Sequence, residues 1–303
     1  MRYEIRASSP KNPPPLEINE TTYKDVRDAR NFLLGLLQVE EDYDILMSNY
    51  LDLEKTVHNV TLEAHIRPRM ERVEFDKDKR FVNRALINLF SSARAFGDHT
   101  KHHCASISGK KSSSYETIHG YFDRKKDHPL SFRAIEIIRN HAQHFGLPAQ
   151  AFVYQGQWKD WEDPGNSKLL LSIVPSLLAG ELRTDRGIDK KLLHELISSR
   201  GEEVPLLPLV REYVSYLSSI AFKVRLLYAD RQVASINILE NLMHHFEKVD
   251  GGSYGINIIA VRLDEESKEI EKIPLSIELE ARLKTLQRSN PQTPNLHKFQ
   301  IIS

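Results

Sequence analysis

The chain has 303 residues, of which 40% are hydrophobic and 28% are charged, a composition typical of a folded globular protein of about two domains. Its 42 basic residues balance 42 acidic ones, so any contact with nucleic acid or a membrane surface has to come from local patches. The single cysteine, Cys104, excludes an internal disulfide and is typical of a reducing compartment. No apolar run approaches the roughly 20 residues of a membrane span, and the first residues lack the apolar core of a signal peptide. We therefore expect a cytoplasmic protein without membrane contact.

Helical periodicity dominates the first half of the chain. An N-terminal arm, residues 1–19, is expected to hold a short edge strand from Tyr3 to Ala7 and a proline-rich spacer. A helical bundle over residues 20–148 then follows. Its helices are predicted at residues 22–38, 40–64, 78–104, 115–127 and 132–148, with a flexible Ser/Gly/Lys linker at 105–114 and a capping box formed by Ser113 and Glu116.

Residues 149–303 are expected to form an α-rich region with minor strands. Pro175 restricts one of these strands to a sheet edge or a bend, and the tail from Ser289 is expected to be loose. Nothing in this region carries recognisable chemistry. Strands are predicted at residues 151–158, 168–178 and 255–263, and helices at 189–199, 206–227, 231–249 and 277–287. The fold class is thus mainly α, a helical bundle followed by an α-rich extension.

The segment FRAIEIIRNHAQHFGLP, residues 132–148, combines an apolar helix face with a polar cluster. Arg139, Asn140, His141 and His144 lie within six positions, and Gly146 with Pro148 marks the end of the helix. Polar residues that interrupt an otherwise apolar run are more often functional than accidental. The alternative is that Arg139 and His144 only satisfy the last carbonyls of the helix.

Arg139 and His144, with the small polar Asn140 after the arginine, resemble the Arg-x4–6-His signature of the HEPN superfamily, helical domains that often act as metal-independent ribonucleases. The chain also holds a second pair at this spacing, Arg94 and His99, but only the first pair ends a helix that follows a long amphipathic helix. The resemblance covers residues 20–148. It implies a toxin-like or antiviral-defence endoribonuclease without cofactor or metal, with an antitoxin or regulatory protein as a further partner.

Helix geometry adds a constraint of its own. A five-residue step turns about 140°, so Arg139 and His144 of one chain do not share a helix face. Two chains packed across a two-fold axis can bring both pairs into one cleft. The resemblance likewise implies a composite dimer site, so we expect a homodimer.

The residue types suit RNA cleavage. His144 can accept or donate a proton near neutral pH, and its position in the last helical turn favours the imidazolium. Arg139 offers a forked cation to phosphate oxygens, and Asn140 can orient substrate or imidazole. The resemblance implies products with 2′,3′-cyclic phosphate ends. His141 is a supporting candidate on another face of the helix.

A second polar cluster ends the helix predicted at residues 78–104. His99 and His103 are four residues apart, a spacing that can hold zinc, with Asp98 or Cys104 as a third ligand. The alternatives are a solvated helix end, which the sequence favours, or a contribution of Arg94, Asp98 and His99 to the cleft around His144, with Asp98 orienting a catalytic imidazole.

Substrate contacts are expected from the cations that flank the motif, although such runs are more often solvated surface. These cations are Lys110, Lys111, Arg124, Lys125 and Lys126. Trp158 and Trp161 can stack bases but more often pack a domain junction. The leading alternative to an RNase is a non-catalytic helical module that dimerises or binds a partner. A third hypothesis is a bundle that binds a small molecule or a nucleotide, with metal on His99 and His103.

Overall fold

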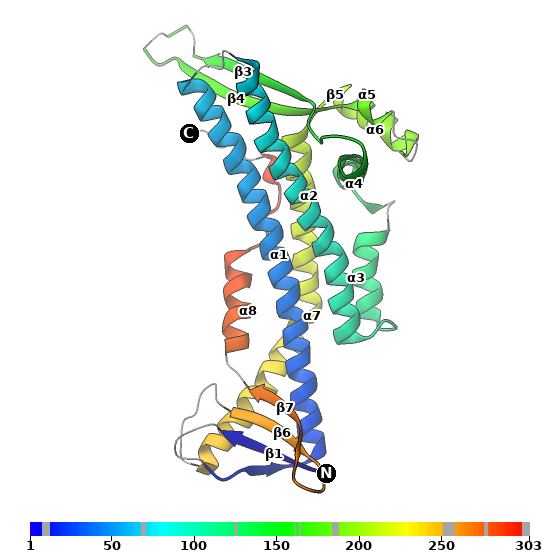
Figure 1. Ribbon diagram of the computed structural model, residues 1–303, viewed down its shortest axis with the longest axis vertical. Coiled ribbons are helices and arrows are strands. Elements are labelled where there is room, and N and C mark those ends of the chain that lie inside the picture. The colour runs from blue at the N-terminus through cyan, green and yellow to red at the C-terminus, as the bar shows by residue number, and fades with distance from the viewer. Residues whose placement is uncertain are drawn as a thin grey trace. The chain divides into compact units, whose positions relative to one another are not determined.

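The computed structural model describes residues 1–7, 13–67, 71–124, 127–160, 162–163, 165–183, 188–250, 258–275 and 278–298. The protein is mainly helical, with a few short antiparallel strands in two small sheets, as predicted (Figure 1). The helices are α1 (Glu20–Ile66), α2 (Arg72–Ser108), α3 (Ser113–Asp123), α4 (Leu130–His144), α5 (Ala179–Leu182), α6 (Lys190–Arg200), α7 (Leu206–Asp250) and α8 (Glu278–Ser289), with a 3-10 turn at Leu296–Lys298. The strands are β1 (Arg2–Ala7), β2 (Leu16–Ile18), β3 (Ala151–Lys159), β4 (Lys168–Leu178), β5 (Glu203–Pro205), β6 (Ile258–Leu263) and β7 (Glu269–Leu275).

The chain divides into two compact units, each made of segments that are distant in sequence. Unit 1 comprises Met1–Asp44, Asp98–His119 and Phe222–Pro291, and unit 2 comprises Ile45–Gly97, Gly120–Ala221 and Gln292–Ser303. The bundle and the extension predicted from the sequence each contribute to both units.

Unit 1 contains a four-stranded antiparallel sheet of order β2-β1-β6-β7. The prediction of an edge strand at the N-terminus is wrong, because β1 pairs with β2 on one side and with β6 on the other. Strand β7 was not predicted, because charged residues lie among its apolar ones. Only Ile273 and Leu275, two positions apart, show the alternation of buried and exposed residues that is typical of a strand. These two side chains give the strand its apolar face.

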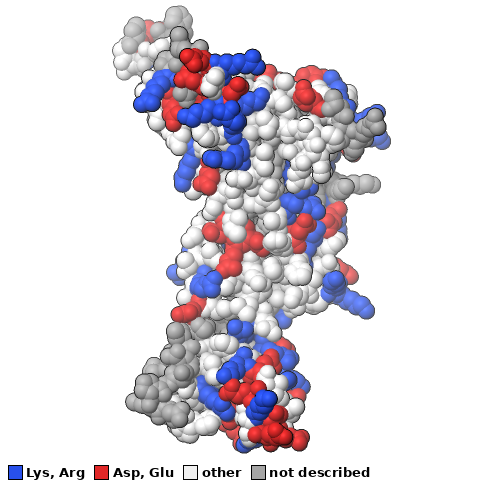
Figure 2. Space-filling model, viewed as in Figure 1, with Lys and Arg blue, Asp and Glu red and all other residues white. Residues whose placement is uncertain are grey.

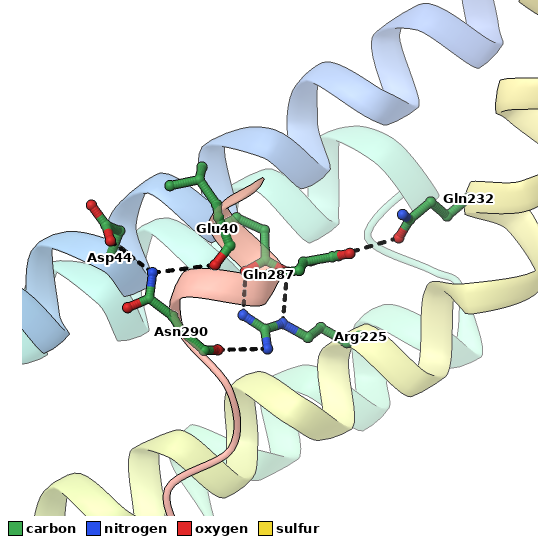
Figure 3. Close-up of polar contacts among 7 residues, drawn as sticks. Glu40, Asp44, Arg225, Gln232, Gln287 and Asn290 are labelled. Carbon is green, nitrogen blue, oxygen red and sulfur yellow. Dashed lines mark hydrogen bonds and ion pairs between the residues drawn. The ribbon is translucent and has the colours of Figure 1, made fainter. Parts of the chain in front are cut away.

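A polar network lies in the helical part of unit 1 (Figure 3). Glu40 is 2% exposed and accepts two hydrogen bonds from Arg225, which also donates to the backbone carbonyl of Asn290 at 2.8 Å. Gln287 donates to Glu40 at 3.1 Å, and the side chain of Asn290 donates to Asp44 at 2.7 Å. The network therefore joins α1, α7 and the end of α8 through buried polar groups.

Unit 2 contains the second sheet, of order β3-β4-β5. Strand β4 is the central strand, but Pro175 pairs only with Phe152, because β5 pairs with Ser176 to Leu178 alone. The position of Pro175 at an open edge agrees with the prediction. Asn83 of α2 donates to the carbonyl of Ala149 at 3.0 Å and accepts from its N–H at 2.9 Å, which fixes the chain just after α4.

Several predicted breaks do not exist. The helices predicted at 22–38 and 40–64 are one helix, α1, and those at 206–227 and 231–249 are one helix, α7. The predicted linker begins too early, since α2 continues to Ser108, and the hydroxyl of Ser112 rather than Ser113 accepts from the N–H of Tyr115 at 3.1 Å. Pro and Gly are absent at each joined break, so the helical hydrogen bonds continue.

The chain after α8 is held against α7 rather than loose. Ser218 accepts from the N–H of Thr293 and Ser215 from the N–H of Leu296, both at 2.9 Å. Both serine hydroxyls thus satisfy backbone N–H groups of the segment that follows α8. The prediction of a loose tail is therefore wrong for the described residues up to Lys298.

Candidate functional site

Helix α4 carries the Arg-Asn-x3-His motif at its C-terminal end. Its apolar residues Phe132, Ile135 and Ile138 are buried, and this burial orients the helix within unit 2. The helix ends at His144, before the predicted Pro148, because the backbone N–H groups of the next two residues turn back to the carbonyl of His141. His144 is thus the last helical residue.

Arg139 is held within unit 2 by two neighbours on its own helix. Its Nη2 donates to the side-chain oxygen of Asn140 at 2.7 Å and lies 3.6 Å from a carboxylate oxygen of Glu136. The side chain is 13% exposed, and its Nε has no hydrogen-bond partner in the described structure. The guanidinium is therefore positioned by neighbours while one of its donors is unused.

Glu136 links Arg139 to two other helices. Arg94 of α2 lies 3.6 Å from the same carboxylate oxygen, and the hydroxyl of Tyr213 on α7 lies 3.5 Å from the other. Burial raises the pKa of Tyr213, with the charge of Glu136 adding to the shift, so this phenol stays neutral. Arg94 and Arg139 thus share one carboxylate, while the contribution of Arg94 to a cleft around His144 stays a prediction.

His144 and Asn140 are exposed. The ring of His144 lies 6.3 Å from that of Phe145, and no hydrogen bond or ion pair connects Arg139 with His144 in the described residues. The two groups of the motif thus remain separate within one chain, as the helix geometry predicts.

His141 has a different environment from the other polar residues of α4. It is 3% exposed, and its ring stacks on that of Phe145 with centroids 5.8 Å apart. A Cβ at Gly146 would lie 3.2 Å from the ring Nε2, so the glycine makes room for this imidazole. Within the described structure the buried Nδ1 has no hydrogen-bond partner. His141 therefore packs in unit 2 and does not present its ring to solvent.

Asp98 and His99 belong to unit 1, where they have partners of their own. Asp98 lies 3.4 Å from the ammonium of Lys101, and His99 lies 3.0 Å from Asp42. His103 lies 3.7 Å from the other oxygen of Asp42, and burial lowers its pKa. A role for Asp98 and His99 beside His144 stays a prediction.

The hypothesis that His99 and His103 bind zinc is not supported by a third ligand in the described residues. In the described part of the chain no group of three or more His, Cys, Asp or Glu residues is arranged to hold a metal ion. Burial raises the pKa of Cys104 to about 12, which disfavours the thiolate that zinc requires. The carboxylate of Asp42, which sequence reasoning missed, instead hydrogen-bonds to the ring of His99 and lies near that of His103.

The flanking cations are only partly described. Lys110 and Lys111 are exposed in the turn between α2 and α3, and Arg124 is exposed after α3. Lys125, Lys126 and Trp161 lie outside the described residues. Trp158 is 57% exposed on β3, so the prediction that it packs a junction is wrong for this tryptophan.

Glu136 and Tyr213 were missed by sequence reasoning. Glu136 had a usable signal, since it precedes Arg139 by three positions, a spacing that favours an ion pair on a helix. Tyr213 had none, because its contact joins residues 77 positions apart.

Comparisons with protein-family models, curated proteins and solved structures found no match to this chain. In the described residues no helix is long and apolar enough to cross a membrane.

Proposed function

We propose that the protein is a metal-independent endoribonuclease whose active site is completed by a second copy of the chain. The observation that supports this most is the end of α4, where Arg139 is fixed by Asn140 and Glu136 while His144 is exposed at the last helical position. This arrangement carries the HEPN-like signature with its cation positioned and its imidazole accessible. No metal is required by these groups.

The chemistry follows from the roles that these groups can fill. A 2′-hydroxyl attacks the adjacent phosphorus, its proton passes to a base, and the bond from phosphorus to the 5′-oxygen breaks as that oxygen gains a proton. The products are a 2′,3′-cyclic phosphate and a 5′-hydroxyl. His144 serves as acid or base, and Arg139 binds the phosphate oxygens whose charge rises in the transition state.

Exposed apolar residues beside His144 favour a site that a second copy covers. Phe145 is 62% exposed and Leu147 is 42% exposed. Adjacent exposed apolar side chains mark interaction surfaces more often than an isolated one does. Because Arg139 and His144 point to different sides of α4, a second α4 supplies the missing group in each half of the site.

The test is RNA cleavage in EDTA by the purified dimer, beside Arg139→Ala and His144→Ala. We expect both variants to lose activity by about 100-fold or more, the scale of a lost acid–base or oxyanion contact. His58→Ala and Arg288→Ala, at exposed sites outside α4, are the matched controls and should keep full activity. Cleavage that survives in both motif variants, or no cleavage by a confirmed dimer, would reject the proposal.

A toxin or defence role has its own readout. Expression in the cytoplasm should slow growth, His144→Ala should relieve the effect, and an antitoxin or regulatory protein would be recovered with the inactive variant. Relief by His58→Ala to the same extent would contradict a role of the motif.

The exposed side chains of Phe145 and Leu147 also favour a second candidate function, a non-catalytic module that dimerises. Phe145→Ser combined with Leu147→Ser should then abolish the dimer, measured by light scattering, in a protein that never cleaves RNA. Cleavage lost together with the dimer supports the nuclease.

A further inference from the structure

One face of α2 is exposed along the part of the helix that belongs to unit 2. Lys77, Arg80, Arg84 and Arg94 are exposed and fall within about 120° of the helix circumference. We call these four residues the basic face of α2. From Lys77 to Arg94 the face extends over about 26 Å at 1.5 Å per residue.

Acidic residues are missing from the same stretch of sequence. Between Lys79 and Gly97 the chain has no Asp or Glu, although 28% of all its residues are charged. The nearest carboxylates before it are Asp76, which is exposed, and Asp78, which is 1% exposed and accepts from the hydroxyl of Tyr154. Figure 2 shows Lys and Arg side chains, with some Asp and Glu among them, over the part of unit 2 where α2 begins.

Two of the cations are held in place by an aromatic ring. The ammonium of Lys77 and the guanidinium of Arg84 each lie 5.5 Å from the centroid of the Phe81 ring. Such contacts restrain the long side chains without neutralising them. Lys77, Arg80 and Arg84 form no ion pair with a carboxylate of the described residues. Their charge therefore remains available to an anionic ligand.

The face ends at the candidate site. Arg94, its last member, lies 3.6 Å from Glu136, the carboxylate that also lies 3.6 Å from Arg139. A polyanion lying along α2 would thus arrive at the arginine of the α4 motif. The rest of the exposed surface of this stretch is uncharged and polar, with Asn88 and Ser91.

We propose that the basic face of α2 binds the sugar–phosphate backbone of single-stranded RNA and leads it to the end of α4. The inference rests on the proposed ribonuclease function, whose substrate it specifies. Single-stranded RNA is favoured over a duplex because in-line attack by a 2′-hydroxyl requires a backbone that can leave the regular A-form. A single row of cations also matches one strand, and phosphate contacts carry most of the affinity of such complexes.

The test measures binding separately from cleavage. The probe is a short fluorescent single-stranded RNA with 2′-O-methyl groups, which cannot be cleaved through its 2′-oxygen, and its affinity is followed by anisotropy between about 50 and 200 mM salt. The variant Lys77→Gln, Arg80→Gln, Arg84→Gln removes three cations of the basic face and leaves Arg94 and the α4 motif intact. A matched control, Lys268→Gln, Arg288→Gln, Lys298→Gln, removes three exposed cations elsewhere.

For three lost phosphate contacts, the slope of log affinity against log salt should fall by about 2, at about 0.7 per contact on a single strand. The control should keep the original slope. An unchanged slope in the α2 variant overturns the inference, and so does an equal loss in the control. Tighter binding of a duplex of the same sequence, through the same three residues, overturns the single-strand assignment.

These outcomes are distinguishable from failure of the proposed function. If native protein cleaves RNA but the α2 variant binds normally, the RNase stands and the basic face has no role in binding. If binding depends on the basic face and no RNA is cleaved, the RNA surface stands and the RNase is rejected.

Discussion

Arg225 and Glu40, 185 positions apart, form a two-point ion pair in unit 1 (Figure 3). The guanidinium Nε and Nη2 lie 2.8 and 2.6 Å from the two carboxylate oxygens. Glu40 is 2% exposed and the Arg225 side chain 14%, so water screens this pair weakly. The third guanidinium nitrogen, Nη1, donates to the carbonyl of Asn290, and the Cζ atom lies 5.4 Å from the centroid of the Tyr43 ring.

Arg225→Met should lower the free energy of unfolding by about 3–5 kcal/mol, because it leaves the buried Glu40 carboxylate without its cation. The double variant Glu40→Met, Arg225→Met removes both charges and should be closer to native stability. Urea denaturation followed by circular dichroism measures all of these values. Lys24→Met, which breaks the exposed i,i+4 pair with Glu20, is the control and should cost far less than Arg225→Met. An equal loss in Arg225→Met and the control would contradict the role of burial.

Gly35 of α1 lies under the side chain of Ile107 of α2, and both residues belong to unit 1. A Cβ at position 35 would stand 2.3 Å from the Ile107 Cγ2, closer than any real contact. Gly35→Ala should therefore destabilise the protein by about 1–3 kcal/mol, although alanine favours helix by about 1 kcal/mol. In an Ile107→Ala background the clash is absent, and the same substitution should stabilise by about 1 kcal/mol. The reversal of sign in thermal unfolding is the diagnostic result, and the same sign in both backgrounds would rule out the clash.

The sequence predicted most helices and strands but broke two long helices where charged residues interrupt the apolar pattern. One false break lies at Glu40 and the other next to Asp230. Periodicity treats a charged residue as exposed, whereas Glu40 is buried because Arg225 neutralises it from a distant part of the chain. A contact across 185 positions leaves no local signal.

The candidate site shows the same limit. The motif at Arg139, Asn140 and His144 follows from local spacing along α4, and so does the separation of Arg139 from His144 within one chain. Which groups hold Arg139 depends on packing between helices, and so Tyr213 was missed. Local spacing also placed His141 beside the other polar residues, while tertiary packing buries it.

His128 gives unit 2 a pH dependence. It is 5% exposed, and burial lowers its pKa, an effect opposed by its bond to the Tyr121 carbonyl and by Asp127, Asp123 and Glu136. The folded protein thus favours the neutral imidazole, whereas the unfolded chain takes up a proton near pH 6.5. The contribution of this group is complete above about pH 6.5 and is lost as the pH falls through the lowered value.

We therefore expect the unfolding free energy to fall as the pH drops below about 6.5, and His128→Gln to reduce that fall. Glutamine can still donate to the Tyr121 carbonyl, which His128 contacts at 3.1 Å. His58→Gln, at an exposed histidine, should leave the pH profile of native protein unchanged. A steeper profile in His128→Gln would show the opposite sign for the shift.

Mixing two inactive variants tests the composite site directly. In Arg139→Ala every site lacks its cation, and in His144→Ala every site lacks its imidazole, so each homodimer is inactive. After subunit exchange about half of the dimers contain one chain of each kind, and each keeps one native arginine and one native histidine. If these two groups act across the dimer, about a quarter of native activity should return, because half of the dimers then keep one of their two Arg139–His144 pairs intact. The mixture is assayed for RNA cleavage after mass spectrometry has confirmed the mixed dimers.

If mixed dimers form and no activity returns, Arg139 and His144 do not act across the dimer. The exposed imidazole at the end of α4 would then need an explanation within a single chain.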